Sequence, residues 1–382
     1  MITTTRIRIG AVAAMLALLV TGCAQSPEAA PATPEVPELQ QQVVDAFAAE
    51  AEELGVIGAF LLVRSPEGEF SAAYGTTERG TETPPTADTV FRIGSNTKTM
   101  TGTVILQLVD EGMLSLDDTV SKYLDGVPNG DEITLAMLLS MRSGLPNYTD
   151  SAGFDAAIEA DPERVWQPQE MLDMAFQSEP LFDPGSEYSY SNTNTVLLAL
   201  IAEQVTGTNY EQLISDRLMQ PLGLTHTLVP RADEAGLAEP FSHGYTYIDE
   251  NTDPLDVTFM SPSWASAAGA GVSTANELAA WVEALTGGEL LSADLQAERM
   301  ASIQPIPGAP DATGWGYGLG IAKLHGLLGH NGELPGFNSF MGVDPERELT
   351  VVMWANLAPG ADGKGPADQL ASVVVPMLLG GE

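Results

Sequence analysis

The sequence predicts an α/β fold of the α+β kind, with an antiparallel sheet built from both ends of the chain, flanking helices and an inserted, mainly helical region. Strand patterns occur over residues 58–75 and return over residues 314–357, whereas Pro and Gly divide the segment between them into helices and loops. Hydrophobic residues make up 44% and charged residues 18% of the 382 residues, which is typical of a globular protein with a sizeable core. A cleft is expected where the sheet meets the helical region.

Local patterns predict each element of this fold. A helix is expected over residues 39–54, where apolar residues recur at helical spacing and a glycine follows as a stop signal. A hairpin is expected over residues 58–75 around Pro66-Glu67-Gly68, and an apolar, amphipathic helix over residues 96–112. Further strands and a last helix are expected in the C-terminal part, over residues 314–324, 326–332, 336–344, 348–357 and 366–379.

The N-terminal residues predict export. Arg6 and Arg8 precede an apolar run over residues 11–20, which is too short to span the ~30 Å of hydrocarbon in a bilayer and is typical of a cleaved signal. The run leads into Val-Thr-Gly-Cys, and small residues before a lone cysteine resemble the bacterial lipobox, in which the cysteine is lipidated. A lipoprotein signal is therefore expected over residues 1–22, and a plain secretory signal with an unrelated cysteine is the alternative.

Cys23 is the single cysteine, so a disulfide within the chain is impossible. Residues 23–38, with the lipidated Cys23 and a Pro/Ala/Glu-rich composition that cannot bury a core, would form a tether, and residues 39–380 the folded domain. The expected location is the cell envelope, where the exported lipoprotein would be anchored to a membrane. The formal net charge of −37, without a Lys/Arg cluster, excludes nucleic acid as a partner.

Ser95 and Lys98 lie in the segment FRIGSNTK, at the expected start of a helix. Ser95 could be an ordinary N-cap, with its hydroxyl accepting a backbone N–H. Residues three apart on a helix share a face, however, so the Lys98 amine can reach the Ser95 hydroxyl, and the helix N-terminus favours negative charge there. This arrangement indicates an activated serine nucleophile, with Lys98 acting either as the proton acceptor or as a fixed positive charge.

Two further motifs contain polar residues that could join this pair. Tyr190 and Asn192 are two apart in an extended segment and could both face the cleft, and the pKa of Tyr190 is expected to fall near the Lys98 cation. His330 and Gly332 alternate on a predicted strand, where a glycine often marks the close approach of a ligand or backbone. Taken singly, these motifs also fit a half-buried tyrosine with an asparagine cap and a histidine at a strand end.

In this order and separation, the three motifs resemble the S-x-x-K, Y-x-N and K-or-H-x-G elements of the serine β-lactamase and penicillin-binding protein superfamily. The closest likeness is to secreted D-alanyl-D-alanine carboxypeptidases and class C-like serine hydrolases, whose third motif is H-x-G. The resemblance implies a β-lactamase/transpeptidase-like fold. It extends over roughly residues 40–380, through FRIGSNTKTMTGTVILQLVDEGMLSLDDTVSKYL, LLSMRSGLPNYT, PGSEYSYSNTN, PSWASAAGAGVST and GWGYGLG.

The resemblance also implies an acyl-enzyme mechanism. Ser95 would attack a carbonyl group, while Lys98 and Tyr190 would move the proton from the serine to the leaving group and later from water. No metal ion or other cofactor is implied. The remaining assignments are substrate contacts: Asn192 to the substrate amide, His330 and Gly332 to its polar end, the backbone N–H groups of Ser95 and Glu333 to the oxyanion, and Trp264 as a pocket wall or simply part of the core.

The likeness departs at one position. Carboxypeptidases of this group carry an arginine just after the GYGLG strand, matched to the free carboxylate of the substrate. Here the strand continues Ile321-Ala322-Lys323, and Lys323 would point to the other face of a regular strand.

The expected activity is hydrolysis of D-alanyl peptides, including peptidoglycan peptides, or of related small amides and esters, with β-lactams as acylating ligands. An esterase and a weak class C-like β-lactamase remain alternatives. So does a binding module, a slowly acylated penicillin-binding sensor lipoprotein.

Overall fold

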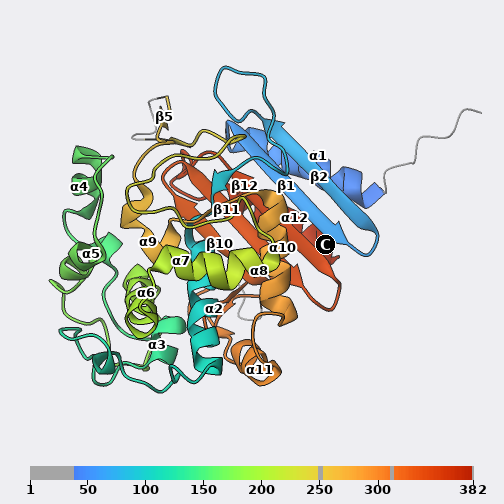
Figure 1. The fold of residues 1–382 in the computed structure, drawn as a ribbon. Helices are drawn as coiled ribbons and strands as arrows, with labels where there is room; N and C mark the ends of the chain where they lie inside the picture. The colour runs from blue at the N-terminus through green and yellow to red at the C-terminus, as the bar shows by residue number, and fades with distance from the viewer. Residues whose placement is uncertain (1–37, 248–252, 310–313, 381–382) are drawn as a thin grey trace, which may run out of the picture. The chain divides into compact units, whose positions relative to one another are not determined.

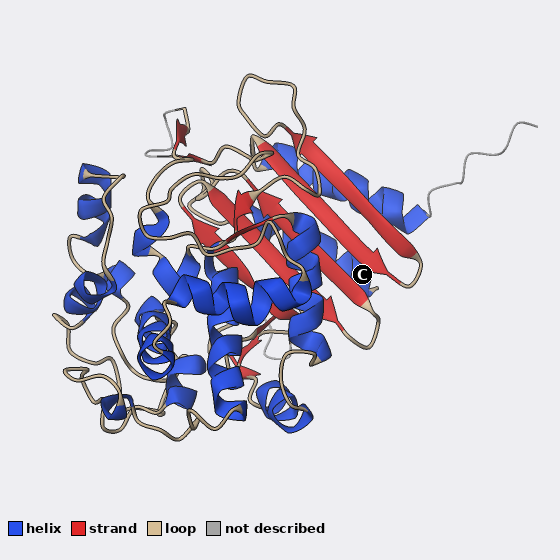
Figure 2. Ribbon diagram, viewed as in Figure 1, coloured by secondary structure: helices blue, strands red, loops and turns tan. Residues whose placement is uncertain are grey.

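The computed structural model describes residues 38–247, 253–309 and 314–380, so the predicted signal and Cys23 lie outside the described residues. An eight-stranded antiparallel sheet has the order β2-β1-β12-β11-β10-β9-β8-β7 (Figures 1 and 2). The prediction of a sheet built from both ends of the chain is confirmed. Its strands are β1 (Gly58–Ser65), β2 (Gly68–Gly75), β7 (Gln304–Pro305), β8 (Gly316–Tyr317), β9 (Ala322–Leu324), β10 (Leu327–Leu334), β11 (Phe337–Asp344) and β12 (Leu349–Ala355).

Strands β1 and β12, the second and third strands from one edge of the sheet, join the two ends of the chain. Phe60 lies opposite Trp354 in this pairing, and their rings stack with centroids 6.5 Å apart. Leu61 packs in the cluster on one side of the sheet and Leu62 in the cluster on the other. Both faces are therefore buried, which explains why these strands are continuous apolar runs and do not alternate with polar residues.

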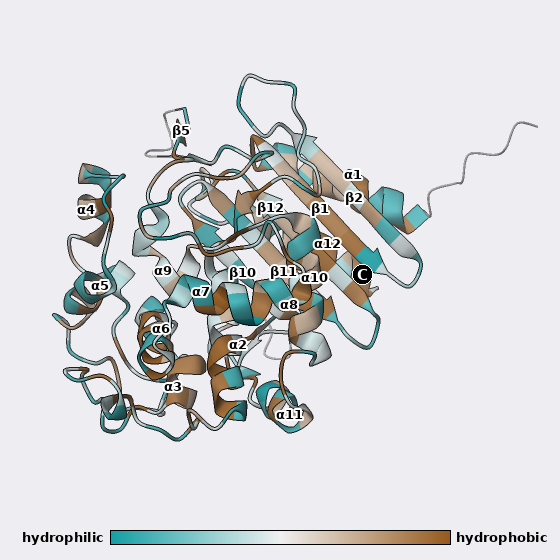
Figure 3. Ribbon diagram, in the orientation of Figure 1, coloured by the Kyte–Doolittle hydropathy of each residue, from teal (hydrophilic) through white to brown (hydrophobic). Residues whose placement is uncertain are grey.

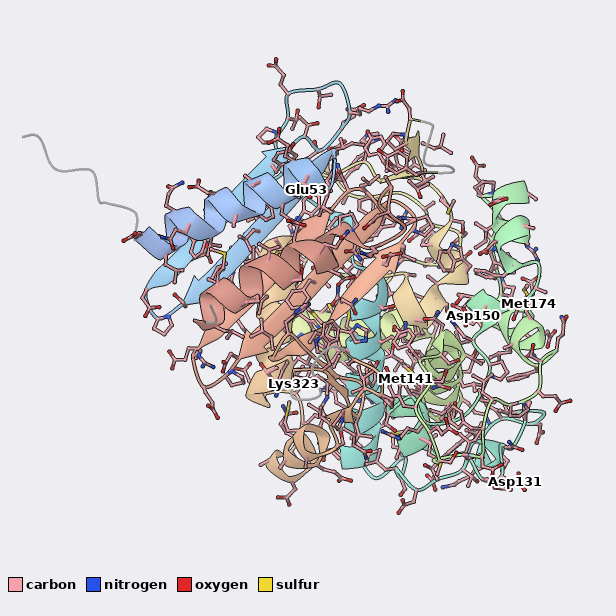
Figure 4. All side chains as sticks on the ribbon, turned by 180° about the vertical axis from the view of Figure 1, so that it is seen from behind. Glu53, Asp131, Met141, Asp150, Met174 and Lys323 are labelled. Atoms are coloured by element: carbon pink, nitrogen blue, oxygen red, sulfur yellow. The ribbon has the colours of Figure 1, made fainter. Side chains whose placement is uncertain are left out.

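Helices cover both faces of the sheet. Helices α1 (Glu38–Glu53) and α12 (Pro366–Leu379) lie side by side on one face, as the view from behind in Figure 4 shows. On the other face lie α2 (Thr97–Asp110) and α10 (Ala275–Gly287), in one apolar cluster with the helical region. Figure 3 shows the apolar stretches along β1 and α2. This packing places the start of α2 beside β10.

The inserted region is mainly helical, as predicted, and two small sheets, β3 with β6 and β4 with β5, lie at its margins. Its helices are α3 (Leu135–Leu139), α4 (Phe154–Ala160), α5 (Pro168–Ala175), α6 (Asn192–Thr206), α7 (Tyr210–Ile214), α8 (Gln220–Leu222) and α9 (Ser266–Gly269), and α11 (Ala293–Ala301) follows α10. The short strands are β3 (Phe91–Arg92), β4 (Tyr245–Thr246), β5 (Leu255–Asp256) and β6 (Val272–Ser273).

Two expectations about single elements were wrong. Helix α2 is buried on all sides, not amphipathic, because its threonines are satisfied by backbone carbonyl groups: Thr99 donates to Asn96 O at 2.7 Å. Residues 314–324 form two short antiparallel strands, not one, because a tight turn with Gly320 at φ +64° separates β8 from β9. Across the described ranges, no helix is both long enough and apolar enough to cross a bilayer.

Candidate active site

Ser95 lies in a single 3₁₀ turn, Gly94–Asn96, that leads directly into α2. Gly94 adopts the left-handed conformation, φ +52°, which a glycine adopts without strain. The alternative of Ser95 as an ordinary N-cap is wrong, because Asn96 occupies that position and no side chain caps the helix there. The Ser95 hydroxyl instead accepts a hydrogen bond from Lys98 Nζ at 2.9 Å.

Lys98 is the most connected polar side chain of the site. Its Nζ also donates to Asn192 Oδ1 at 2.7 Å and to the backbone oxygen of Ala268 at 2.7 Å. Lys98 is 2% exposed, and this burial lowers its pKa well below the ordinary value. Because burial disfavours the ammonium form, the arrangement favours Lys98 as a proton acceptor over a fixed positive charge.

Tyr190 and Asn192 both face Lys98, because Ser191 between them is extended at φ −145°. The Tyr190 ring centroid lies 4.8 Å from Lys98 Nζ, and its hydroxyl shares a hydrogen bond with that of Ser95. The expected fall in the pKa of Tyr190 was wrong: burial raises it, and this effect exceeds the lowering by the bond to Ser95. Tyr190 is therefore a neutral phenol that can donate a proton.

His330 lies on β10 and is 2% exposed. Its Nδ1 lies 2.6 Å from the backbone oxygen of Asn331, which can only accept, so Nδ1 carries the proton. Burial, with a smaller contribution from Lys98, lowers the pKa of His330 to about 3, so the imidazole is neutral and Nε2 is an acceptor. Tyr317 Oη, 3.1 Å from Nε2, therefore donates to it.

Tyr317 was not singled out from the sequence. It lies on β8, 13 residues before His330, and only the pairing of β8, β9 and β10 brings the two together. The GYG segment around it was noted as a strand, but nothing in a strand pattern indicates a hydrogen bond two strands away.

Gly332 on β10 lies against the turn Gly94–Asn96 that holds Ser95, which we call the nucleophile turn. A Cβ on Gly332 would overlap the backbone oxygen of Ile93 and lie 2.9 Å from Ser95 N. A Cβ on Gly94 would lie 2.5 Å from Glu333 N. The predicted close approach is therefore real, and the two backbone nitrogens assigned to the oxyanion lie at one junction.

The Glu333 carboxylate forms a pair with Asp368, the third residue of α12. Asn338 Nδ2 lies 3.3 Å from both Glu333 Oε2 and Asp368 Oδ2, and Asn331 Nδ2 donates to Asp368 Oδ1 at 3.0 Å. Burial raises the pKa of Asp368 to about 6, and burial together with the neighbouring Asp368 raises that of Glu333 to about 7. The sequence indicated only a backbone role for Glu333, and the pair is not apparent in it because its members are 35 positions apart.

Trp264 is partly buried in the 3₁₀ turn Pro262–Trp264. Its ring makes an edge contact with Phe154 at 5.6 Å, and its backbone oxygen accepts from Tyr148 at 2.7 Å. Its role as a pocket wall stays a prediction. Among the residues that the structure describes, no three His, Cys, Asp or Glu side chains gather as metal ligands would.

Comparison with known proteins decides the family. The Beta-lactamase family model matches residues 42–375. The chain belongs to the beta-lactamase family. It is thus a serine hydrolase by family, and the predicted β-lactamase-like fold is confirmed.

The beta-lactamase-family chain is similar to two solved amidohydrolases. A D-stereospecific amidohydrolase from Streptomyces sp. is 32% identical, with a TM-score of 0.78 over 90% of this chain and 99% of that one. D-amino acid amidase from Ochrobactrum anthropi, complexed with L-phenylalanine amide, is 26% identical, with a TM-score of 0.77 over 90% and 99%.

The chain is also similar to two curated bacterial proteins. A Bacillus subtilis protein provisionally named penicillin-binding protein PbpX is 29% identical over 81% of this chain and 73% of its own length. Protein flp of Staphylococcus aureus is 26% identical over 83% of this chain, which spans 63% of that relative's length.

Proposed function

We propose that this chain is a D-aminoacyl amidohydrolase that acts through an acyl-enzyme on Ser95. One observation carries the proposal: Nζ of Lys98, a buried amine with a strongly lowered pKa, lies 2.9 Å from the Ser95 hydroxyl oxygen, while Asn192 and Ala268 accept the two N–H donors of its neutral form. In its neutral form Lys98 can take the serine proton, as an activated nucleophile requires. The substrate class is supported by the likeness to D-stereospecific amidohydrolase and D-amino acid amidase.

The steps use residues already at hand. Ser95 Oγ forms a bond to the substrate carbonyl carbon as its proton moves to Lys98, and the N–H groups of Ser95 and Glu333 stabilise the oxyanion. The C–N bond then breaks, and the departing nitrogen receives a proton from Lys98 through the neutral phenol of Tyr190. Water then attacks the acyl carbon while its proton passes to Lys98 by the same route, the bond between Ser95 Oγ and the acyl carbon breaks, and Oγ regains a proton from Lys98 as the acid leaves. Each oxyanion donor typically contributes about 10²–10³ in rate.

Mass spectrometry and a substrate panel test the proposal. Purified protein is incubated with D-amino acid amides, their L-enantiomers, D-alanyl-D-alanine peptides, esters and a fluorescent penicillin, and any adduct is located by peptide mapping. We expect turnover of D-amides over L-amides and an adduct on the peptide that contains Ser95. Equal labelling of Ser95→Ala would contradict the assignment of the nucleophile. One acylation per molecule without turnover would favour the penicillin-binding sensor.

We also propose that the mature protein is a lipoprotein anchored to a membrane of the cell envelope through Cys23. The support is the lipobox-like Val-Thr-Gly-Cys after a short apolar run. Cys23→Ser should move the protein to the soluble fraction with its hydrolase activity intact. Unchanged membrane partition of that variant would contradict the anchor.

A further inference from the structure

A cavity of about 350 Å³, which we call the aromatic pocket, adjoins the candidate active site. Tyr188, Trp315 and Tyr317 form its aromatic walls, and Ala322 and Leu324 of β9 add an aliphatic surface. Tyr190 and His330 line it as well. Because the Tyr190 ring also lies 4.8 Å from Lys98 Nζ, the pocket reaches the reacting groups.

The described lining of the aromatic pocket carries no Lys, Arg, Asp or Glu side chain. His330 is neutral, since burial lowers its pKa to about 3. Asn331 is a polar residue of the lining, but its side-chain amide already donates a hydrogen bond to the carboxylate of Asp368. An anion placed here would lose its hydration without a cation in the described lining to pair with, whereas an uncharged apolar group would gain by burial.

The position of Tyr190 indicates which part of a substrate the pocket holds. In the steps above, the departing nitrogen receives its proton from Lys98 through Tyr190, so that nitrogen must face these two groups. The acyl part, by contrast, remains bonded to Ser95. A substituent on the departing nitrogen would therefore extend along Tyr190 and into the pocket.

We propose that the aromatic pocket binds the leaving group. The preferred leaving group is an amine whose substituent is uncharged and is aromatic or branched aliphatic. The inference rests on the proposed amidohydrolase function and deepens it. A primary amide, which releases ammonia, would leave the pocket unfilled. The C–N bond breaks, and the departing nitrogen gains the proton that Ser95 lost. Water later cleaves the acyl-enzyme, which releases the acid and restores the Ser95 hydroxyl.

The test compares two substrates with the same acyl part, D-alanine amide and D-alanine benzylamide. Ammonia and benzylamine are of similar basicity, so a difference in kcat/KM reports binding of the benzyl group. We expect the wild type to favour the benzylamide by about tenfold or more, as burial of an aromatic ring predicts. Ala322→Leu, which fills the pocket, should abolish this preference.

Two controls separate this inference from the proposed function. Lys323→Leu changes the next residue of β9, which lines a different cavity with Asp344 and Arg347, and should keep the preference. If Ala322→Leu fails to fold, Tyr188→Ala serves in its place. It removes a partly exposed wall of the pocket without adding volume to the interior, and it should lower the preference.

Binding to the inert Ser95→Ala variant, measured by calorimetry, needs no turnover. Tighter binding of the benzylamide than of the primary amide, lost on adding Ala322→Leu, supports the pocket even if neither amide is cleaved. Equal binding of the two amides overturns it, as does cleavage of the primary amide by the wild type without a preference for the benzylamide. Failure to cleave either amide overturns the proposed function alone.

Discussion

Gly94 and Gly332 face each other where the nucleophile turn meets β10, and neither position has room for a side chain. A Cβ on Gly332 would overlap Ile93 O, and one on Gly94 would lie 2.5 Å from Glu333 N. The atoms nearest to both Cβ positions belong to the backbone, so an added methyl group could not be accommodated by the movement of a flexible side chain. The spacing between the N–H groups of Ser95 and Glu333 therefore depends on two missing side chains.

Gly332→Ala should impair the oxyanion site. The added methyl group must push β10 away from the nucleophile turn, which separates the two N–H groups, and losing one such donor costs about 10²–10³ in rate. The acylation rate is the measurement, with Gly326→Ala in the β9–β10 turn as a control for glycine replacement at φ +91°. A Gly332→Ala variant that acylates at the wild-type rate would show that the oxyanion is bound elsewhere.

Lys98→Ala should fold and lose acylation by about 10³-fold or more, because nucleophile and base act as a unit. Lys98→Arg distinguishes the two roles considered for this residue, since arginine keeps the charge but cannot become a neutral base. We expect Arg to be as inactive as Ala. In the wild type the acylation rate should rise with pH, with an apparent pKa well below that of a free lysine, because burial disfavours the ammonium form. Recovery of activity in Lys98→Arg would make the fixed charge the essential feature.

Tyr317→Phe should disturb His330 without touching the nucleophile. Loss of the phenol leaves Nε2 of a buried imidazole without its donor, which typically costs about 1–3 kcal/mol of stability. We expect a lower Tm and a shifted ¹⁵N resonance of His330 Nε2, which a purely structural role of Tyr317 would not produce. Tyr188→Phe is the matched control. It removes a hydroxyl from a ring whose centroid lies 6.0 Å from that of Tyr317, and it should leave the His330 resonance in place.

The sequence was sufficient for features that depend on short spacing. Ser95 and Lys98 share a helix face because they are three apart, and Tyr190 and Asn192 face Lys98 because an extended residue separates them. The final helix was predicted with its observed bounds, since Pro366 and the apolar periodicity mark them.

Features that depend on tertiary packing were missed. The pKa of Tyr190 rises because burial outweighs its hydrogen bond to Ser95, and burial of a single side chain cannot be seen in a tripeptide. Helix α2 was expected to be amphipathic, yet its threonine side chains donate to backbone oxygens inside the core. The Glu333–Asp368 pair requires the docking of α12 against the sheet.

Glu333→Gln should stabilise the protein at alkaline pH. Burial raises the pKa values of Glu333 and Asp368 to about 7 and about 6, above the ordinary 4.5 and 3.8, and repulsion by Asp368 adds to the rise at Glu333. Carboxyl groups with raised pKa values favour the fold most below pH 4, and this contribution is lost as pH rises through 6 to 7.

The measurement is Tm at two pH values. We expect a gain of about 1–2 °C for Glu333→Gln at pH 8 and none at pH 5. The effect is modest because Glu333, although its carboxylate is held beside Asp368, is exposed as a whole residue, so that water screens part of its charge. Glu67→Gln in the β1–β2 turn is the control. A gain of equal size at both pH values would show that charge repulsion in the pair is not the cause.

Ala322 decides how the site treats a free carboxylate. It lines the aromatic pocket beside His330, whereas Lys323 (labelled in Figure 4) lines a separate cavity. The lysine therefore cannot replace the arginine that carboxypeptidases keep. A missing charge-assisted contact costs about 1.5–3 kcal/mol, or roughly one to two powers of ten in kcat/KM. A peptide ending in D-Ala-D-Ala and its C-terminal amide should therefore be cleaved within about tenfold of each other.

Ala322→Arg should shift this balance toward the free acid, because a guanidinium in the pocket can pair with the carboxylate, while Lys323→Arg should leave it unchanged. Steady-state kcat/KM for the peptide acid and the peptide amide measures the shift, and matched Tm values check that the buried arginine is tolerated. A hundredfold preference of the wild type for the acid would mean that another cation reaches the pocket, and the carboxypeptidase interpretation would then replace the amidohydrolase.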